Sequence, residues 1–171
     1  MVNSNLKNNN PLNIRYSPRI SDYPGQTGTN KGYLTFVTLE LGFRAGIELL
    51  CYYQRRGYDT IRKIIEQWIT GTEKEIDAFI EYICHDFGSY YDLTLDDGFD
   101  PDERIVDFDD LAEVAWSMFK REYGEEFQHS PECRKAYFSA KYSASPDSLK
   151  YFGITGPDTI MKSYNYPYLR K

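Results

Sequence analysis

The central part of the chain carries apolar residues at the three- and four-residue spacing of amphipathic helices. This pattern predicts four helices, over residues 39–56, 60–68, 73–86 and 108–123. The residues that favour helix starts and stops flank these stretches as expected. They are the caps Thr38 and Asp59, the T-x-x-E capping box of Thr72 and Glu75, and the stops Gly57 and Gly124.

The two ends of the chain have a different pattern. Residues 1–31 are rich in Asn, Gly and Pro, which predicts irregular backbone, and the alternating residues 32–38 predict a short strand. After residue 129, prolines stand where short helices can begin, at Pro131, Pro146 and Pro157. We therefore expect a mainly α fold with three parts: an irregular arm (1–31), a helical domain (32–128) and a Tyr-rich C-terminal extension (129–171).

Composition and charge narrow the classes of function. The three cysteines are widely spaced, and the acidic loop around residues 92–102 does not fit calcium-binding spacing, so we expect neither disulfides nor a metal or cofactor. No stretch is apolar enough for a signal peptide or a membrane span. The acidic middle lies between basic ends, which favours contact between copies over binding to nucleic acid.

The most distinctive segment runs from Asn8 to Arg15, with the sequence Asn-Asn-Asn-Pro-Leu-Asn-Ile-Arg. Asn tolerates left-handed backbone and bonds to nearby backbone groups, so such a run can hold a fixed irregular loop. We expect Asn9, Asn10 and Asn13 to fix this loop against the domain. We also expect Arg15 to pair with a carboxylate or with helix-end carbonyls. A simple structural turn remains the alternative.

The segments that follow extend this pattern. They are Gly25-Gln26-Thr27-Gly28, then Gly42-Phe43-Arg44-Ala45, then Arg56-Gly57-Tyr58-Asp59-Thr60, and a helix ending at Trp68. Together with the Asn run, they resemble phage and prophage virion proteins that carry an Asn-Asn-Asn-Pro-Gly-Asn-Ile-Arg motif. The same order is similar to flagellar-type glucosaminidases. The resemblance covers residues 8–85 well and continues more faintly to Gly124, with Leu12 in place of the motif's Gly. It implies a lysozyme-like, muramidase-related domain, with Arg44 and Trp68 as motif residues.

In that family, the C-terminal helix ends in His-Glu-Asn-Gly, where this chain has Arg121-Glu122-Tyr123-Gly124. Cleaving a glycosidic bond needs an acid whose pKa is raised by a partly apolar site. The resemblance implies that Glu122 is that general acid, and we expect it to lie near Trp116, Phe119 and the loop of residues 8–15. Because the flanking His and Asn are replaced, we expect a structural role without catalysis. The alternatives are a virion-associated or prophage peptidoglycan hydrolase, a glycan-binding adaptor, or a plain solvated Glu at a helix end.

The C-terminal extension is dense in aromatic residues, which favour interfaces. We expect the chain from about residue 143 onward to lie across another copy. The predicted interface residues are Tyr151, Phe152, Tyr164, Tyr166 and Tyr168. The resulting expectation is a structural component of a phage virion, in the tail or as a ring in the portal-proximal neck. Its partners would be copies of itself and other virion proteins, with peptidoglycan as a partner in the catalytic alternative. It would be made in the cytoplasm of a host bacterium.

Overall fold

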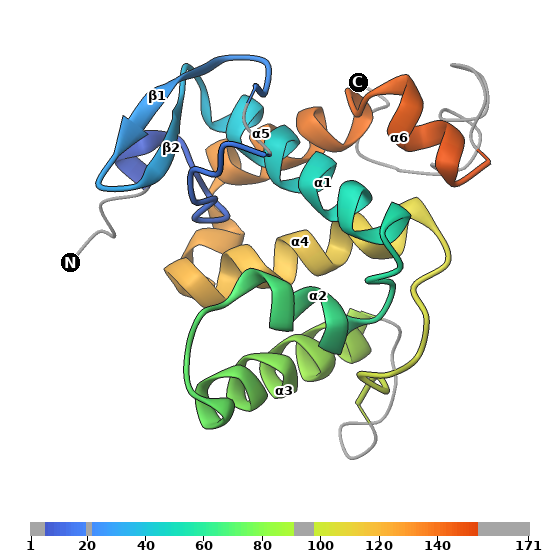
Figure 1. The fold of residues 1–171 in the computed structure, drawn as a ribbon. Coiled ribbons are helices and arrows are strands. Elements are labelled where there is room, and N and C mark those ends of the chain that lie inside the picture. The colour runs from blue at the N-terminus through green and yellow to red at the C-terminus, as the bar shows by residue number, and fades with distance from the viewer. Residues whose placement is uncertain (1–5, 20–21, 91–97, 154–171) are drawn as a thin grey trace.

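A computed structural model describes residues 6–19, 22–90 and 98–153 of the chain. These residues are mainly helical, as predicted, with one small antiparallel sheet (Figure 1). In chain order, the elements are η1 (Leu6–Asn8), β1 (Gln26–Asn30), β2 (Tyr33–Phe36), α1 (Leu39–Arg55), α2 (Ile61–Trp68), α3 (Glu73–Tyr90), α4 (Phe108–Tyr123), η2 (Glu125–His129), α5 (Pro131–Tyr142) and α6 (Pro146–Tyr151).

Most of the predicted helix signals act as expected. The Thr38 hydroxyl accepts a hydrogen bond from the Leu41 N–H and caps α1. Thr72 and Glu75 form the reciprocal capping box of α3, and the Glu75 carboxylate accepts the Thr72 N–H at 2.8 Å. Gly124, at a φ of 103°, ends α4. However, α3 runs on to Tyr90 instead of ending at Asp86, so this boundary was predicted too early.

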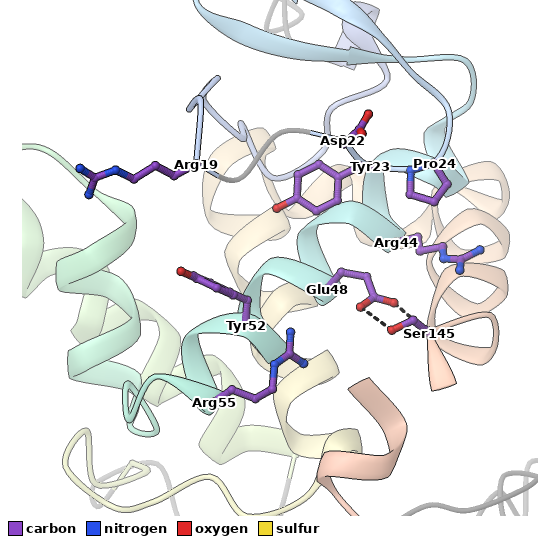
Figure 2. A pocket seen from close by; sticks show the side chains of 9 residues that line it. All are labelled: Arg19, Asp22, Tyr23, Pro24, Arg44, Glu48, Tyr52, Arg55 and Ser145. Carbon is purple, nitrogen blue, oxygen red and sulfur yellow. Dashed lines mark hydrogen bonds between the residues drawn. The ribbon is translucent and has the colours of Figure 1, made fainter. Parts of the chain in front are cut away.

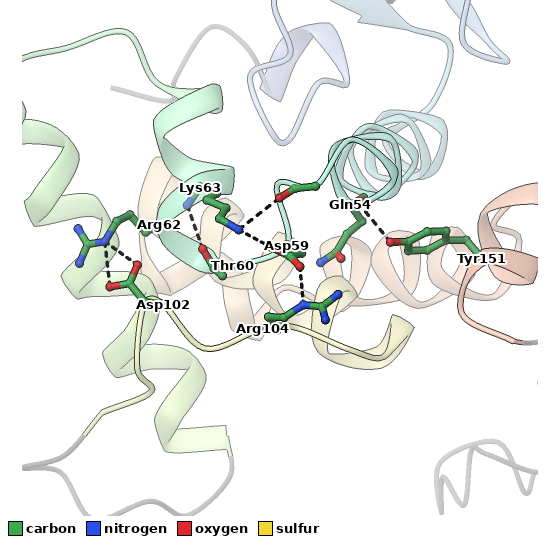
Figure 3. Close-up of polar contacts among 9 residues, drawn as sticks. Gln54, Asp59, Thr60, Arg62, Lys63, Asp102, Arg104 and Tyr151 are labelled. Atoms are coloured by element: carbon green, nitrogen blue, oxygen red, sulfur yellow. Dashed lines mark hydrogen bonds and ion pairs between the residues drawn. The ribbon is translucent and has the colours of Figure 1, made fainter.

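The prediction that Asp59 caps α2 was wrong. Thr60 is the cap, because its hydroxyl accepts the Lys63 N–H at 3.3 Å. The Asp59 carboxylate binds two cations instead, Lys63 at 2.8 Å and Arg104 at 2.5 Å (Figure 3). Since the Ile105 N–H also donates to the Asp59 carbonyl at 2.8 Å, the segment before α4 is held against the start of α2.

The predicted strand over 32–38 is β2, and its partner β1 lies in the segment that we expected to be irregular. The two strands pair in antiparallel register from Asn30 and Tyr33, with a bulge near Gln26. The sequence did not reveal this strand, because β1 is polar throughout and all its residues but Gln26 are exposed. Leu34 and Phe36 of β2 face the core and are buried.

The core is built around α1. In Figure 1, this helix lies between the hairpin, α5 and α6 on one side and α4, α2 and α3 on the other. Phe43 of α1 is fully buried, and its ring lies 5.0 Å from Phe119, 5.8 Å from Tyr137 and 5.9 Å from Trp116. Trp68 and Trp116 are both half-buried, and both pack against this core rather than at its centre.

The described part of the C-terminal extension packs on the same core. Cys133, Tyr137 and Ala140 of α5 are buried. In α6, the Tyr151 hydroxyl donates to the Gln54 carbonyl at 3.2 Å, and the Phe152 ring beyond it lies 5.9 Å from Phe108. Residues 143–153 therefore contact their own chain, and their predicted contact with a second copy stays a prediction. Pro157, Tyr164, Tyr166 and Tyr168 lie outside the described residues.

Among the described residues, no helix has both the length and the apolar character needed to cross a membrane. No group of three His, Cys, Asp or Glu side chains in this part of the chain is arranged to hold a metal ion.

Candidate functional site

The Asn run forms a fixed loop against the hairpin, and Asn10 is its anchor. Asn10 is fully buried. Its amide nitrogen donates to the carbonyls of Ile14 and Leu34, both at 3.0 Å, and its amide oxygen accepts the Ile14 N–H at 2.9 Å. One buried side chain thus closes the loop on itself and fastens it to β2, as buried polar groups require.

Two other Asn residues of the run adopt left-handed backbone. Asn9 and Asn13 both have a φ of 54°, a conformation that Asn tolerates better than most residues. Asn9 uses its amide nitrogen to bind the carbonyls of Phe36 and Val37, at 3.0 and 3.1 Å. Asn9 and Asn10 therefore both hydrogen-bond the loop to β2 and the residues that follow it.

The loop lies directly on α1, where two glycines make room for it. A Cβ atom at Gly42 would stand 1.8 Å from the Asn9 carbonyl oxygen, and one at Gly46 would stand 2.8 Å from the Leu12 side chain. Leu12, which replaces the motif's Gly, is fully buried in this groove. The substitution therefore adds apolar burial between the loop and α1.

The end of α4 meets this loop across more than a hundred residues of sequence. The Asn13 amide nitrogen donates to the Glu122 carboxylate at 2.6 Å. The Tyr123 hydroxyl lies 2.9 Å from the Asn13 amide oxygen and 2.9 Å from the Asn10 carbonyl. We call the set of Asn13, Glu122 and Tyr123 the Asn13 clasp.

The Glu122 carboxyl lies in a partly apolar setting. Burial raises its pKa above the ordinary value, while the Asn13 hydrogen bond and the Arg121 charge act in the opposite direction. The Arg121 guanidinium lies over the rings of Phe79 and Tyr82, 5.5 and 5.7 Å from their centroids. Burial likewise raises the pKa of Tyr123, so its hydroxyl keeps its proton and remains a donor.

A raised pKa is the property that a general acid needs, yet glycosidases of the usual kind use two carboxyl groups. The groups that shift the pKa of Glu122 within the described residues include Arg121 and Asn13 but no second carboxylate. The side chain of Glu125 lies outside the described part of the structure. The arrangement can therefore hold a proton or fasten the loop.

The other motif residues lie away from the clasp. Arg15 is exposed and donates to the Tyr33 hydroxyl at 3.3 Å, with its guanidinium 5.3 Å from that ring. The prediction of a carboxylate or helix-end partner for Arg15 was therefore wrong for the described residues. Trp68 packs edge-on against Tyr53 at 6.2 Å. Arg44 lines a pocket on α1 that shares no residue with the clasp.

Sequence reasoning placed Glu122 near the Asn loop but missed how the loop is seated. Gly42 and Gly46 are four residues apart and therefore share one helix face, which was the available signal for a close approach. Tyr123 was noted only as a departure from the family pattern, and its hydroxyl proves to be the second contact of the clasp.

Comparison of the chain with models of known protein families and with curated proteins gives no match.

Proposed function

We propose that this chain is a structural component of a bacteriophage particle, in the tail or in the neck next to the portal. In this proposal it is built on a muramidase-like domain that no longer cleaves glycan. The virion assignment depends on the motif resemblance described above. The geometry bears on the choice between a structural and a catalytic role for Glu122.

The Asn13 clasp is the observation that favours the structural role. At 2.6 Å, one oxygen of Glu122 is engaged by Asn13, and the Asn13 amide oxygen is engaged in turn by Tyr123. Tyr123 stands where relatives have Asn, is 8% exposed, and fills the space beneath the loop. Glu122 and Tyr123 thus both make hydrogen bonds to the protein's own loop.

A glycan hydrolase is the second candidate, and a different observation favours it. Glu122 is only half-buried, and burial raises its pKa, as expected for a group that must protonate a leaving oxygen.

The two candidates are separated by the Glu122→Gln variant. Gln keeps an oxygen that can accept the Asn13 hydrogen bond but cannot donate a proton as an acid. Wild-type and variant chains are incubated with purified peptidoglycan, and released reducing ends are counted. We expect both to show background release and to melt at similar temperatures. Turnover by the wild type that Glu122→Gln abolishes, with folding intact, would establish the hydrolase and overturn the structural proposal.

The virion assignment has its own test. Antibodies to this chain should label purified phage particles, and gold labels seen by electron microscopy should gather at the tail or the neck. Particles that carry no label, from a culture in which the chain is made, would contradict the assignment whatever the peptidoglycan assay gives.

A further inference from the structure

A pocket of about 310 Å³ lies along α1, between the loop that precedes the hairpin and the start of α6 (Figure 2). In this view, the Tyr23 hydroxyl points into the space from above and the Arg55 guanidinium points into it from below. Tyr52 stands at one side and Glu48 at the other. The volume is in the range of small-molecule sites in proteins.

Two polar groups that line the pocket lack partners. The Tyr23 hydroxyl and the Arg44 Nε–H are buried, and neither has a hydrogen-bond partner among the described residues. Buried polar groups are nearly always paired, so these two donors in the wall of one pocket would be stabilised by an acceptor that reaches them. Burial raises the pKa of Tyr23, so its hydroxyl stays protonated and can donate.

The charge of the lining points to the kind of acceptor. The lining includes three arginines, Arg19, Arg44 and Arg55, and two acidic residues, Asp22 and Glu48, in a chain whose formal net charge is −6. In Figure 2 the Arg55 guanidinium points into the space, while those of Arg19 and Arg44 lie at its two sides and point outward. The pocket is therefore a locally basic site on an acidic protein, and anions are favoured there.

Glu48 keeps its negative charge at this site, but other donors already hold its carboxylate oxygens. Its carboxylate accepts the Ser145 N–H at 2.5 Å, the Ser145 hydroxyl at 3.0 Å and the Ser148 hydroxyl. Within the described residues, the hydrogen bond of Arg55 is a single long one, 3.5 Å to Ser148. The arginine N–H groups thus remain available to a ligand, while the carboxylate is occupied.

We propose that this pocket binds a small oxyanion, a carboxylate or phosphate group, through Arg44, Arg55 and the Tyr23 hydroxyl. Arginine matches the planar pair of oxygens in such groups, and the Tyr23 and Tyr52 rings supply apolar walls for the rest of the ligand. This site is separate from the Asn13 clasp, and its existence does not depend on the proposed virion role.

The test titrates the full chain with inorganic phosphate and, in a second arm, with citrate, against sodium chloride at matched ionic strength. Backbone amide shifts in two-dimensional NMR report where each anion binds. We expect saturable shifts at Tyr23, Arg44 and Arg55 with at least one of the two anions, and none with chloride. Which arm saturates identifies phosphate or carboxylate as the ligand group. Shifts confined to other surfaces, or none in either arm, would overturn the proposal.

Variants then test the named groups. Tyr23→Phe removes a hydroxyl that has no hydrogen-bond partner within residues 6–19, 22–90 and 98–153, so the fold should be kept while affinity falls severalfold. Arg55→Gln should weaken binding by about tenfold, since charge-assisted hydrogen bonds are the strong ones. Arg134→Gln, an exposed arginine outside this pocket, is the matched control and should change affinity by less than about twofold. If Tyr23→Phe and Arg55→Gln bind as tightly as Arg134→Gln does, the assignment of these residues is wrong.

Discussion

Asn13 is the residue at which the two distant halves of the clasp meet. Its left-handed backbone turns the side chain toward α4, and both ends of its amide are used, the nitrogen by Glu122 and the oxygen by Tyr123. Asp would lose the donor and Gly would lose both contacts. The position therefore selects Asn by backbone conformation and hydrogen bonding together.

The Tyr123→Phe variant should show how much the Asn13 clasp contributes to the free energy of unfolding. The change removes the hydroxyl and leaves the Asn10 carbonyl and the Asn13 amide oxygen without this donor. Because both acceptors are buried or half-buried, we expect a loss of about 1–2 kcal/mol in the free energy of unfolding. Urea denaturation measures it. Tyr151→Phe, whose hydroxyl also donates to a carbonyl but whose side chain is 46% exposed, should cost clearly less.

The pH dependence of stability should report on Glu122. Its pKa in the folded chain is raised above 4.5, so between 4.5 and the raised value the folded chain holds a proton that the unfolded chain has released. Wild-type stability therefore falls as pH rises through that window and levels off above it. The Gln side chain of Glu122→Gln does not titrate. The free energy of unfolding of this variant, relative to that of the wild type, should therefore increase from about pH 4 upward.

Denaturation at a series of pH values checks this prediction. Glu126→Gln, an exposed neighbour, serves as the control for a change of net charge. A stability difference between Glu122→Gln and wild type that does not change with pH would show that burial does not shift this group.

At the scale of elements, the closest approach is that of the Asn loop to α1. Gly42→Ala should destabilise the chain by about 1–3 kcal/mol, although Ala favours helices, because the new methyl group collides with backbone at Asn9. Gly46→Ala should cost less, because its neighbour is the flexible side chain of Leu12. Thermal melts of the two variants measure the difference. Equal melting temperatures for both variants would mean that the loop does not sit on the helix in this way.

A buried cation joins α5 to α4. Lys141 is 1% exposed, and its ammonium lies 2.8 Å from the Asp109 carboxylate and 3.5 Å from that of Glu113. Lys141→Met keeps the packing of the side-chain stem but leaves the two carboxylates without this charge. We expect a loss of about 3 kcal/mol, as for other broken buried pairs. Chemical denaturation measures it, with exposed Lys135→Met as the control.

The predictions of secondary structure were most accurate where apolar residues recur at helical spacing. The four central helices stand close to their predicted ranges, because each presents an apolar face to the core. By contrast, β1 has no buried residue and no alternation of apolar and polar residues, so its sequence did not predict a strand. Its pairing depends on the neighbouring β2 and the Asn loop, which is tertiary context.

At the scale of the whole molecule, the proximity of Glu122 to the Asn loop was predicted, and this prediction came from the motif resemblance. The rest of the site could not be read from the sequence. The contact of Tyr123 depends on where α4 ends over the loop. The error on Arg15 arose because the half-buried ring of Tyr33 can stabilise the guanidinium without a carboxylate. The pocket at Arg44 joins residues from three segments that no local pattern connects.

The position of α6 also decides where a tail truncation should be made. Cutting after Ala144 would remove Ser145 and Ser148, which hold the Glu48 carboxylate. Truncation after Gly153 leaves all of these contacts in place. We expect the protein shortened at Gly153 to keep its helical circular dichroism and melting temperature but to fail to enter particles or rings. Normal assembly would show that residues 154–171 are not the predicted interface.

The span of the clasp has a consequence for how the chain is made. Asn13 and Glu122 are 109 residues apart, so the N-terminal loop emerges from the ribosome long before its partner exists. At about 5–20 residues per second, the loop waits several seconds or more for α4. During that interval Leu12 can already pack on α1, which follows it closely in the chain, but Asn13 cannot be fastened. We therefore expect this domain to finish folding late in synthesis. The N-terminal loop is made first but should be among the last segments to be fixed in place.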